Sequence, residues 1–433
     1  MRRGLLMLGA VVLLAPGLFA QRPVSDARLP IGRPEDVGMS SARLTRLTTA
    51  MQGYINRKEV AGVVTLIARQ GRVVHFESLG HRSVEDAGAM GIDTMFRLAS
   101  MTKPIVAVAA MMLYEEGAFQ LSDPVSKWLP EFRSMQVIEP QATAGTYTLR
   151  PARAAITVRH VLTQTSGLQN GDGVMQAAYS KIAPRSVPND TLGAFVSRLA
   201  TLPLNFEPGT RWHYGPTGTS MNVVARLVEV ISHQSIDQFL SDRIFKPLQM
   251  RDTHYYVPET KLSRFAAVYK PGADQRIEID EAPTTASVNV REGTYFGGSG
   301  GLVSTAADYF RFQQMMLNGG ELDGVRLLGR KTVELMTANH TGDLYTSQAP
   351  GLGFGLSVSV VTDVGASAQH GSLGTYGWGG AAGTIYFVDP VEQLIGIFMM
   401  QLRPYAHLNI RRDFRTLAYQ SLVGSGTRVI SSN

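Results

Sequence analysis

The sequence predicts an α/β protein of the α+β kind, in which one antiparallel sheet is built from the N- and C-terminal segments and flanked by helices. A mostly helical lobe is inserted between those two segments. Three observations predict this arrangement. Runs rich in β-branched and aromatic residues lie near both ends of the chain, at residues 60–79 and 354–400, and residues 122–265 have helical spacing interrupted by Pro- and Gly-containing loops. Residues 105–114 are apolar on every side, which indicates a buried helix.

The N-terminal elements follow from local patterns. Residues 40–56 are expected to form a helix capped by a serine, because their apolar residues share one stripe. Residues 60–68 and 72–79 are expected to be strands, and Arg69-Gln70-Gly71 between them is a hairpin signal. A short strand at residues 95–97 should lead into the buried helix.

The remaining elements are expected at the following positions. In the middle of the chain we expect a capped helix at residues 156–168, stopped by Gly167, and helices at residues 221–231 and 305–317. Strands at residues 354–361, 383–388 and 394–400 and a closing helix at residues 406–422 complete the chain. We interpret residues 21–433 as one domain, with an α/β lobe at about 38–121 and 300–425 and a helical lobe at about 122–299.

The composition of the chain excludes several kinds of site and ligand. The chain has 433 residues and no cysteine, which excludes disulfides, cysteine-based metal sites and a lipid anchor on cysteine. The net charge is +6, but basic and acidic residues alternate without an aromatic-interleaved patch, so nucleic-acid binding is not expected. The histidines are dispersed without metal-ligand spacing. We therefore expect no metal and no cofactor, and no pattern specifies an oligomeric state.

The first 20 residues have the basic head and short apolar core of a secretory signal. Small residues allow cleavage after Ala20, which predicts a periplasmic or secreted protein. The apolar run is too short to span a bilayer comfortably, and no later segment approaches membrane length. We expect no stable membrane span after signal removal; an uncleaved anchor is the alternative.

The buried helix begins with the pattern Ser-x-x-Lys at Ser100 and Lys103, followed by Pro104 in the first turn. Residues at i and i+3 share one helical face, so the hydroxyl and the amine can meet. A serine becomes a nucleophile when a neighbouring base takes its proton, and a lysine in a desolvated, positive environment can be that base. The alternative is a helix cap beside a solvated lysine. No other lysine here has a serine three residues before it.

A second serine also fits a catalytic pattern. Residues 297–301 satisfy Gly-x-Ser-x-Gly around Ser299, the nucleophile elbow of another hydrolase fold, and Asp308 or Asp363 with His370 would complete a triad in chain order. The elbow requires a buried strand before the serine and a helix directly after it, and neither pattern is present. We favour a glycine-rich turn that lines the cleft, and a structural His370.

Several motifs together resemble the serine β-lactamase and penicillin-binding-protein-like hydrolases, specifically the class C-like branch that contains the family VIII carboxylesterases. The similarity extends from about residue 38 to residue 400. It is carried by residues 100–104, 160–168, 208–214, 300–305 and 376–384.

The resemblance implies roles for individual residues. Ser100 would be the acylated nucleophile, Lys103 its general base, and Tyr214 the tyrosine that exchanges protons with Lys103. Trp378, Gly379 and Gly380 would be the third motif, on a strand at the edge of the cleft. The backbone amides of Ser100 and Ala381 would then form the oxyanion hole.

Two departures from the β-lactam-directed members bear on the substrate. Trp378-Gly379-Gly380 replaces their Lys-Thr-Gly, and Pro216 replaces a polar residue two positions after the tyrosine. Gln164 stands where many relatives have histidine, and we assign it a structural role. The substrate expected is a small-molecule ester, with a β-lactam or a D-aminoacyl peptide as the alternative. A degenerate, non-catalytic binding protein is the alternative of another class.

Overall fold

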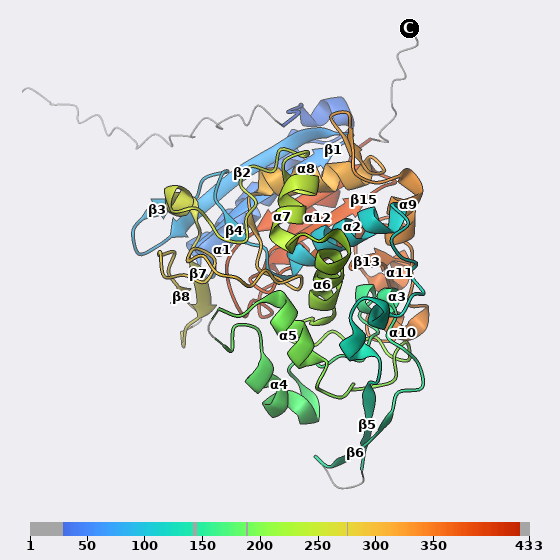
Figure 1. Cartoon of the computed structure of the whole chain (residues 1–433). Helices are drawn as coiled ribbons and strands as arrows, with labels where there is room; N and C mark the ends of the chain where they lie inside the picture. The colour runs from blue at the N-terminus through green and yellow to red at the C-terminus, as the bar shows by residue number, and fades with distance from the viewer. Residues whose placement is uncertain (1–28, 142–144, 188, 275, 425–433) are drawn as a thin grey trace, which may run out of the picture.

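The computed structural model describes residues 29–141, 145–187, 189–274 and 276–424; the expected signal sequence lies outside them. Its centre is an eight-stranded sheet in the order β12-β13-β14-β15-β16-β1-β2-β3 (Figure 1). The two ends of the chain meet where β1 pairs with β16 in antiparallel fashion, with Val64 opposite Met399. The predicted fold class is confirmed. The strands are β1 (Gly62–Arg69), β2 (Arg72–Ser83), β3 (Gly88–Ala89), β12 (Leu352–Phe354), β13 (Ser359–Val361), β14 (Tyr376–Gly379), β15 (Ile385–Asp389) and β16 (Leu394–Met399).

Turn chemistry decides which predicted strands are continuous. Gln70 and Gly71 both have positive φ, 52° and 75°, as the tight turn that joins two antiparallel strands requires, so the predicted hairpin is confirmed. The single strand expected at residues 354–361 is wrong. Ser357 adopts φ 72°, and the Gly355 N–H donates to the Val358 carbonyl at 2.8 Å, so the chain reverses there. The result is the hairpin of β12 and β13.

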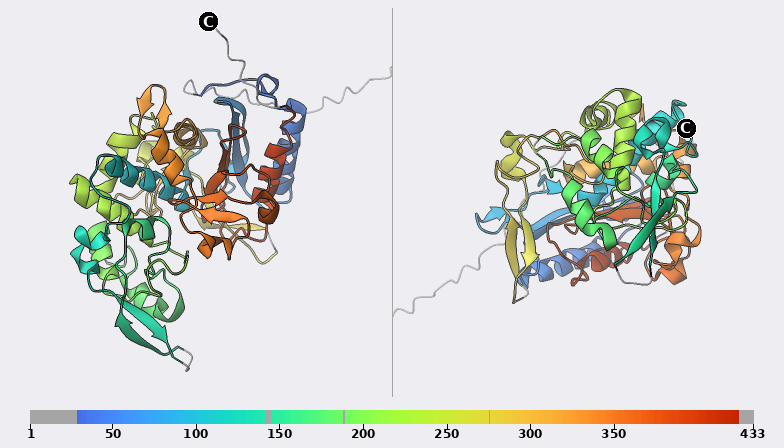
Figure 2. Two further views of the ribbon diagram at one scale, coloured as in Figure 1. Left: turned by 90° about the vertical axis from the view of Figure 1, so that its right-hand side faces the viewer. Right: turned by 60° about the horizontal axis from the view of Figure 1, so that its bottom comes forward.

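Helices cover both faces of the sheet, and residues of β1 alternate between them. Val63 and Ile67 pack with α1 (Ser41–Asn56) and α12 (Ile410–Tyr419), which lie side by side in Figure 2. Val64 and Leu66 belong to the larger core, which includes α2 (Thr102–Glu115) and α8 (Ala306–Leu317). This alternation is the period-2 geometry of a strand buried on both faces. The helix predicted at residues 406–422 is confirmed, but α12 is shorter than predicted at both ends.

The segment between α2 and β9 (Val303–Ser304) contains more than helices. Its helical elements are α3 (Val158–Leu162), α4 (Gln176–Ile182), α5 (Leu192–Leu199), α6 (Ser220–Ser232), α7 (Ile236–Leu240) and a π-helical turn (Ser241–Phe245). Two hairpins were not predicted there: β5 (Gln136–Pro140) with β6 (Tyr147–Pro151), which projects at the bottom of Figure 1, and β7 (Val268–Pro271) with β8 (Ile277–Glu281). They were missed because their strands are short and largely exposed, so no apolar alternation marks them.

One predicted helix ends earlier than expected. Residues 156–168 were expected to be helical until Gly167. Thr157 and His160 do form a capping box, but α3 ends at Leu162. Gln164 has φ 60°, a left-handed conformation that stops the helix before the glycine is reached. This early stop turns the following segment toward the loop that carries Tyr214.

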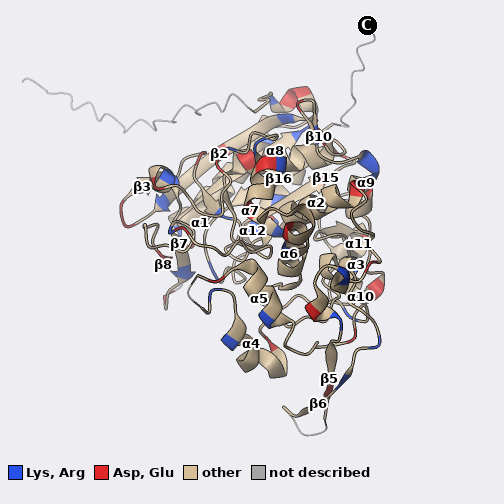
Figure 3. Cartoon of the chain, in the orientation of Figure 1, with Lys and Arg blue, Asp and Glu red and all other residues tan. Residues whose placement is uncertain are grey.

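The remaining elements are short. They are β4 (Phe96–Arg97), which pairs with β9 (Val303–Ser304), β10 (Glu321–Leu322), β11 (Val325–Arg326), α9 (Arg330–Met336), α10 (Asp343–Thr346) and α11 (Val364–Ser367). Basic and acidic side chains are interspersed over the fold in the view of Figure 3. No helix within the described residues is long and apolar enough to cross a membrane.

Candidate active site

Ser100 lies in a single 3₁₀ turn (Ala99–Met101) between β4 and α2. The residue before it, Ala99, has φ 45°, a left-handed conformation that is strained for a side chain with a Cβ. Contacts on both sides hold this backbone. The Leu98 N–H donates to the Leu302 carbonyl at 2.8 Å, and the Tyr309 hydroxyl donates to the Met101 carbonyl at 3.1 Å. Ser100 therefore lies in a strained turn that hydrogen bonds on both sides hold in place, as is common for catalytic nucleophiles.

Lys103 occupies the first turn of α2 and is 1% exposed. Its ammonium donates to Ser100 Oγ at 2.9 Å and to the Ser299 carbonyl oxygen at 2.6 Å. The structure thus brings together the two side chains that the Ser-x-x-Lys spacing placed on one helical face. Their contact is direct, so a proton can pass between them without an intervening water.

Tyr214 reaches the same serine from a loop of the helical lobe. Its hydroxyl donates to Ser100 Oγ at 2.6 Å, and its ring centroid lies 5.0 Å from Lys103 Nζ. Burial alone would raise the pKa of the Tyr214 phenol, but the charge of the Lys103 ammonium and hydrogen bonds with Lys103, Ser100 and Trp378 together outweigh burial and hold that pKa below its usual range. A phenol that loses its proton more readily is suited to exchange protons with Lys103 and Ser100.

Trp378, Gly379, Gly380 and Ala381 lie at the end of β14, beside the turn that carries Ser100. The Trp378 ring packs edge-on against Tyr214, with centroids 5.3 Å apart. A Cβ at Gly380 would stand 2.5 Å from the Leu98 carbonyl oxygen, so glycine is needed for this close approach. The Ala381 N–H has no acceptor among the described residues. It is therefore free to donate to a substrate oxygen.

An aromatic cluster surrounds the phenol. Trp212 stacks on Tyr214 with centroids 6.0 Å apart, and behind it pack Tyr345 and Phe354. Trp212 lies far from Tyr345 and Phe354 in the sequence. No sequence spacing links them, so the cluster was not predicted. Its apolar surface fixes the plane of the Tyr214 ring and lines one side of the site.

Gln164 supports the tyrosine loop through its backbone. Its carbonyl accepts the His213 N–H at 3.0 Å, next to Tyr214, while both polar atoms of its buried side chain have no partner among the described residues. The His213 ring pairs with the Asp172 carboxylate at 2.9 Å on the outer side of the same loop. Pro216 is exposed two residues after Tyr214.

Ser299 is not in a nucleophile elbow. No described strand lies between β8 and β9, and α8 begins only at Ala306. Ser299 Oγ donates to the Gly218 carbonyl oxygen at 2.6 Å. The partners proposed for it are engaged elsewhere: Asp308 accepts from the Asp252 and Thr253 region, Asp363 caps α11, and His370 stacks on Tyr419.

Arg411 of α12 is a further group that sequence reasoning did not single out. A Cβ at Gly379 would stand 2.2 Å from Arg411 Nη2, so the guanidinium lies directly against the third motif. Its hydrogen-bond partner among the described residues is the Tyr405 hydroxyl, and none of the described carboxylates forms an ion pair with it. Burial lowers the pKa of Arg411.

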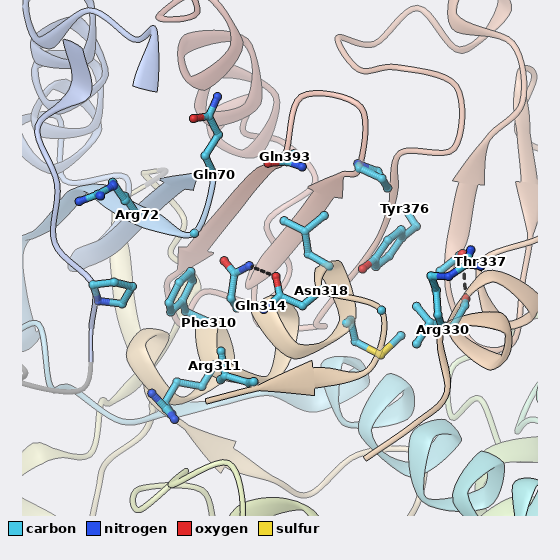
Figure 4. Close-up of a pocket in the computed structure, with 18 of the residues that line it drawn as sticks. Gln70, Arg72, Phe310, Arg311, Gln314, Asn318, Arg330, Thr337, Tyr376 and Gln393 are labelled. Atoms are coloured by element: carbon cyan, nitrogen blue, oxygen red, sulfur yellow. Dashed lines mark hydrogen bonds between the residues drawn. The ribbon is translucent and has the colours of Figure 1, made fainter. Parts of the chain in front are cut away.

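A groove of about 1300 Å³ lies elsewhere, between α8, α9 and the start of β14 (Figure 4). It is lined by Tyr376, Gln314 and Asn318, and none of Ser100, Lys103 or Tyr214 borders it. Two of its arginines form ion pairs, Arg311 with Asp323 and Arg330 with Glu334. The hydrogen-bond convergence on Ser100 therefore identifies the candidate site better than cavity size does.

The arrangement is that of a serine acyl-transfer enzyme in which a lysine and a tyrosine replace the usual histidine. The family described as Beta-lactamase matches residues 47–420, and the chain belongs to that family. Together with the esterase named below, this makes the protein a serine hydrolase.

Similar proteins cover most of this chain. Protein Rv1367c of Mycobacterium tuberculosis is 35% identical over 358 residues, which are 80% of this chain and 86% of that protein. Esterase EstB of Burkholderia gladioli is 29% identical over 377 residues, with coverage of 82% and 90%. The structure of EstCE1, a hydrolase with promiscuous acyltransferase activity, superposes with a TM-score of 0.76 at 25% identity and covers 87% of this chain and 99% of that one.

Proposed function

We propose that the protein is an exported carboxylesterase that cleaves esters of small or short-chain acyl groups through a Ser100 acyl-enzyme. The observation that carries the proposal is the convergence of Lys103 Nζ and the Tyr214 hydroxyl on Ser100 Oγ, at 2.9 and 2.6 Å. The similarity to the esterase EstB and to the hydrolase EstCE1 supports it. A binding protein with a degenerate site would have no need to preserve this convergence.

Acylation begins when the neutral amine of Lys103 takes the proton of Ser100. The serine oxygen bonds to the ester carbon, and the carbonyl π electrons move to its oxygen, where the N–H groups of Ser100 and Ala381 stabilise the negative charge. Collapse of this intermediate breaks the bond to the alcohol oxygen. Tyr214 gives its proton to the departing alkoxide and recovers one from the Lys103 ammonium, so the alcohol leaves neutral.

Deacylation runs the same machinery in reverse. Water takes the place of the alcohol, and the neutral amine of Lys103 that the first step regenerates removes its proton. The hydroxide oxygen bonds to the acyl carbon, and the Ser100 oxygen leaves and is reprotonated by Lys103. The carboxylic acid is released and the starting protonation state returns. An alcohol that replaces this water would instead yield a new ester.

The polarity of the cleft favours an uncharged ester. A carboxylate or amide that is desolvated without a partner costs about 1–3 kcal/mol. Gly379, Gly380 and Pro216 offer no side-chain donor for such groups, and Trp378 offers only the neutral N–H of its indole. A simple ester needs only the nucleophile, the base and the two oxyanion amides.

Arg411 favours a second candidate, a substrate that carries a carboxylate, such as a β-lactam or a D-aminoacyl peptide. Its guanidinium lies against Gly379, beside the position where β-lactam-directed relatives carry a lysine. An arginine can bind a carboxylate with two parallel hydrogen bonds. This candidate uses the same Ser100 machinery and differs in the group that anchors the substrate.

One purified sample distinguishes the two candidates. kcat/KM is measured for p-nitrophenyl acetate and butyrate, a chromogenic cephalosporin and a D-aminoacyl peptide. We expect the esters to be preferred and Arg411→Ala to leave ester hydrolysis within threefold. A preference for the cephalosporin that Arg411→Ala abolishes and Arg412→Ala preserves would make the second candidate correct. Arg412 is the control because it is exposed on the same helix.

The proposal that the protein is exported rests on the first 20 residues of the sequence. Expression with the full N-terminus should yield a mature protein whose first residue is Gln21, recovered from the periplasm or the medium. A protein that keeps Met1 and sediments with membranes would support the uncleaved anchor instead.

A further inference from the structure

The glycine-rich turn around Ser299 has no role in the acyl-transfer steps, yet its backbone touches the proposed base. The Ser299 carbonyl oxygen lies 2.6 Å from Lys103 Nζ, closer than Ser100 Oγ at 2.9 Å. Lys103 has a flexible four-carbon stem, so two acceptors are needed to fix the direction of its amine. The position of this carbonyl therefore helps to decide where Nζ points.

Two side-chain hydrogen bonds hold this carbonyl in place. The Ser299 N–H donates to Asn222 Oδ1 at 3.1 Å, and Ser299 Oγ donates to the Gly218 carbonyl oxygen at 2.6 Å. Backbone packing tightens the same turn, because a Cβ at Gly298 would stand 2.0 Å from the Met221 carbonyl oxygen. The turn is thus tied at three places to α6 and to the loop just before it.

Asn222 is an unusual residue for its position. It lies in the first turns of α6, a helix that packs against α2, and is 2% exposed. A buried amide is costly unless it is bonded. Its Oδ1 atom accepts from the Ser299 N–H, which joins α6 to the turn whose carbonyl contacts Lys103.

We infer that Asn222 and the side chain of Ser299 are positioning residues for Lys103: they fix the Ser299 carbonyl, and that carbonyl aims the lysine amine at Ser100. The inference rests on the acyl-enzyme machinery of the proposed function and extends it to two residues that touch neither substrate nor Ser100. The Gly-x-Ser-x-Gly pattern then reflects the support of a base rather than a nucleophile.

The test uses Ser299→Ala, Asn222→Ala and the double variant in the full mature protein. Each single variant should lower kcat for p-nitrophenyl butyrate about tenfold and leave KM within twofold, because only the base is displaced. Since both bonds hold one carbonyl, the double variant should lose about 10- to 30-fold rather than 100-fold. Ser421→Ala is the control: a buried serine that donates at 2.6 Å to a backbone carbonyl in another part of the fold.

A pH profile separates positioning from general loosening. Tyr214 is the titratable group in contact with Lys103 within the described residues. A displaced amine meets Ser100 Oγ poorly at any pH, so kcat should fall by the same factor across the whole pH profile in both single variants. The control variant should keep the wild-type profile.

The rate at which an organophosphonate labels Ser100 is measured in parallel, because it reports activation of the serine whatever the natural substrate is. Labelling should slow about tenfold with each single variant. If esters prove poor substrates while labelling slows, the proposed function fails and this inference stands. Unchanged labelling and kcat, raised KM alone, or a multiplicative double variant would each overturn it. Ser299→Ala decides the matter if Asn222→Ala does not fold, since Ser299 is only partly buried.

Discussion

Gly218 and Lys103 are fitted to each other. A Cβ at Gly218 would stand 2.7 Å from Lys103 Cε and 2.9 Å from Nζ, and Gly218 has φ 53°. No residue with a side chain meets both conditions without moving the lysine. The loop that ends in α6 therefore closes directly over the proposed base, and the absence of a side chain at Gly218 is what allows Lys103 to reach Ser100.

The first prediction follows from that contact. Gly218→Ala should lower kcat about 100-fold, which corresponds to about 2.7 kcal/mol of barrier, because the methyl group displaces the lysine amine. Steady-state kinetics measures the loss, and thermal unfolding checks the fold. Gly117→Ala is the matched control, with φ 77° and nothing within 4 Å of its Cβ. It should cost about the same stability and no activity; equal activity loss in both variants would contradict the prediction.

The second prediction concerns the identity of the nucleophile. Treatment with an organophosphonate should add one adduct, and peptide mapping should place it on Ser100, since two donors converge on its Oγ. Ser100→Ala should be inactive and unlabelled. Ser299→Ala should still label on Ser100, more slowly. An adduct on Ser299, or full activity in Ser100→Ala, would disprove the assignment.

How far the sequence predicts this site depends on distance along the chain. Ser100 and Lys103 share one helical turn, so their spacing alone predicted the contact. Tyr214 and the Trp378-Gly379-Gly380 motif lie far from them in sequence, and only the resemblance to a family singled them out. Asn222, Gly218 and the aromatic cluster were missed, because a hydrogen bond between separate segments leaves no periodic signal.

The fold shows the same limit. The terminal strands were predicted because their residues are buried and β-branched, while the hairpin of β5 and β6 carries largely exposed residues without alternation. Left-handed residues other than glycine caused the clearest errors. Gln164 and Ser357 have φ 60° and 72°, and each ends or reverses an element that its neighbours would continue. Tertiary contacts hold such conformations, and local propensity does not reveal them.

The third prediction tests the base. Lys103→Arg keeps the positive charge, but a guanidinium does not give up its proton in the working pH range, so it accepts none from Ser100. Turnover should fall far more than tenfold while the protein stays folded, as measured by steady-state kinetics and circular dichroism. Retention of more than about a tenth of wild-type kcat, a loss of less than about 1.4 kcal/mol of barrier, would make Lys103 an electrostatic spectator.

The last prediction concerns the phenol of Tyr214, whose pKa is lowered because the Lys103 ammonium and hydrogen bonds with Lys103, Ser100 and Trp378 together outweigh burial. A lowered pKa means that the phenolate appears at lower pH than for an ordinary tyrosine. Ultraviolet difference titration of wild type against Tyr214→Phe should therefore show one phenol ionising early. In Lys103→Met the ammonium and its hydrogen bond are gone, so burial is opposed only by Ser100 and Trp378 and the same difference should move to higher pH. Tyr345→Phe provides the contrast, because burial raises the pKa of Tyr345 to about 12. Two results would contradict this prediction: a difference curve of Tyr214 that matches that of Tyr345, or one that does not move in Lys103→Met. Either would show that the phenol is not coupled to the lysine and would disprove its role in proton exchange.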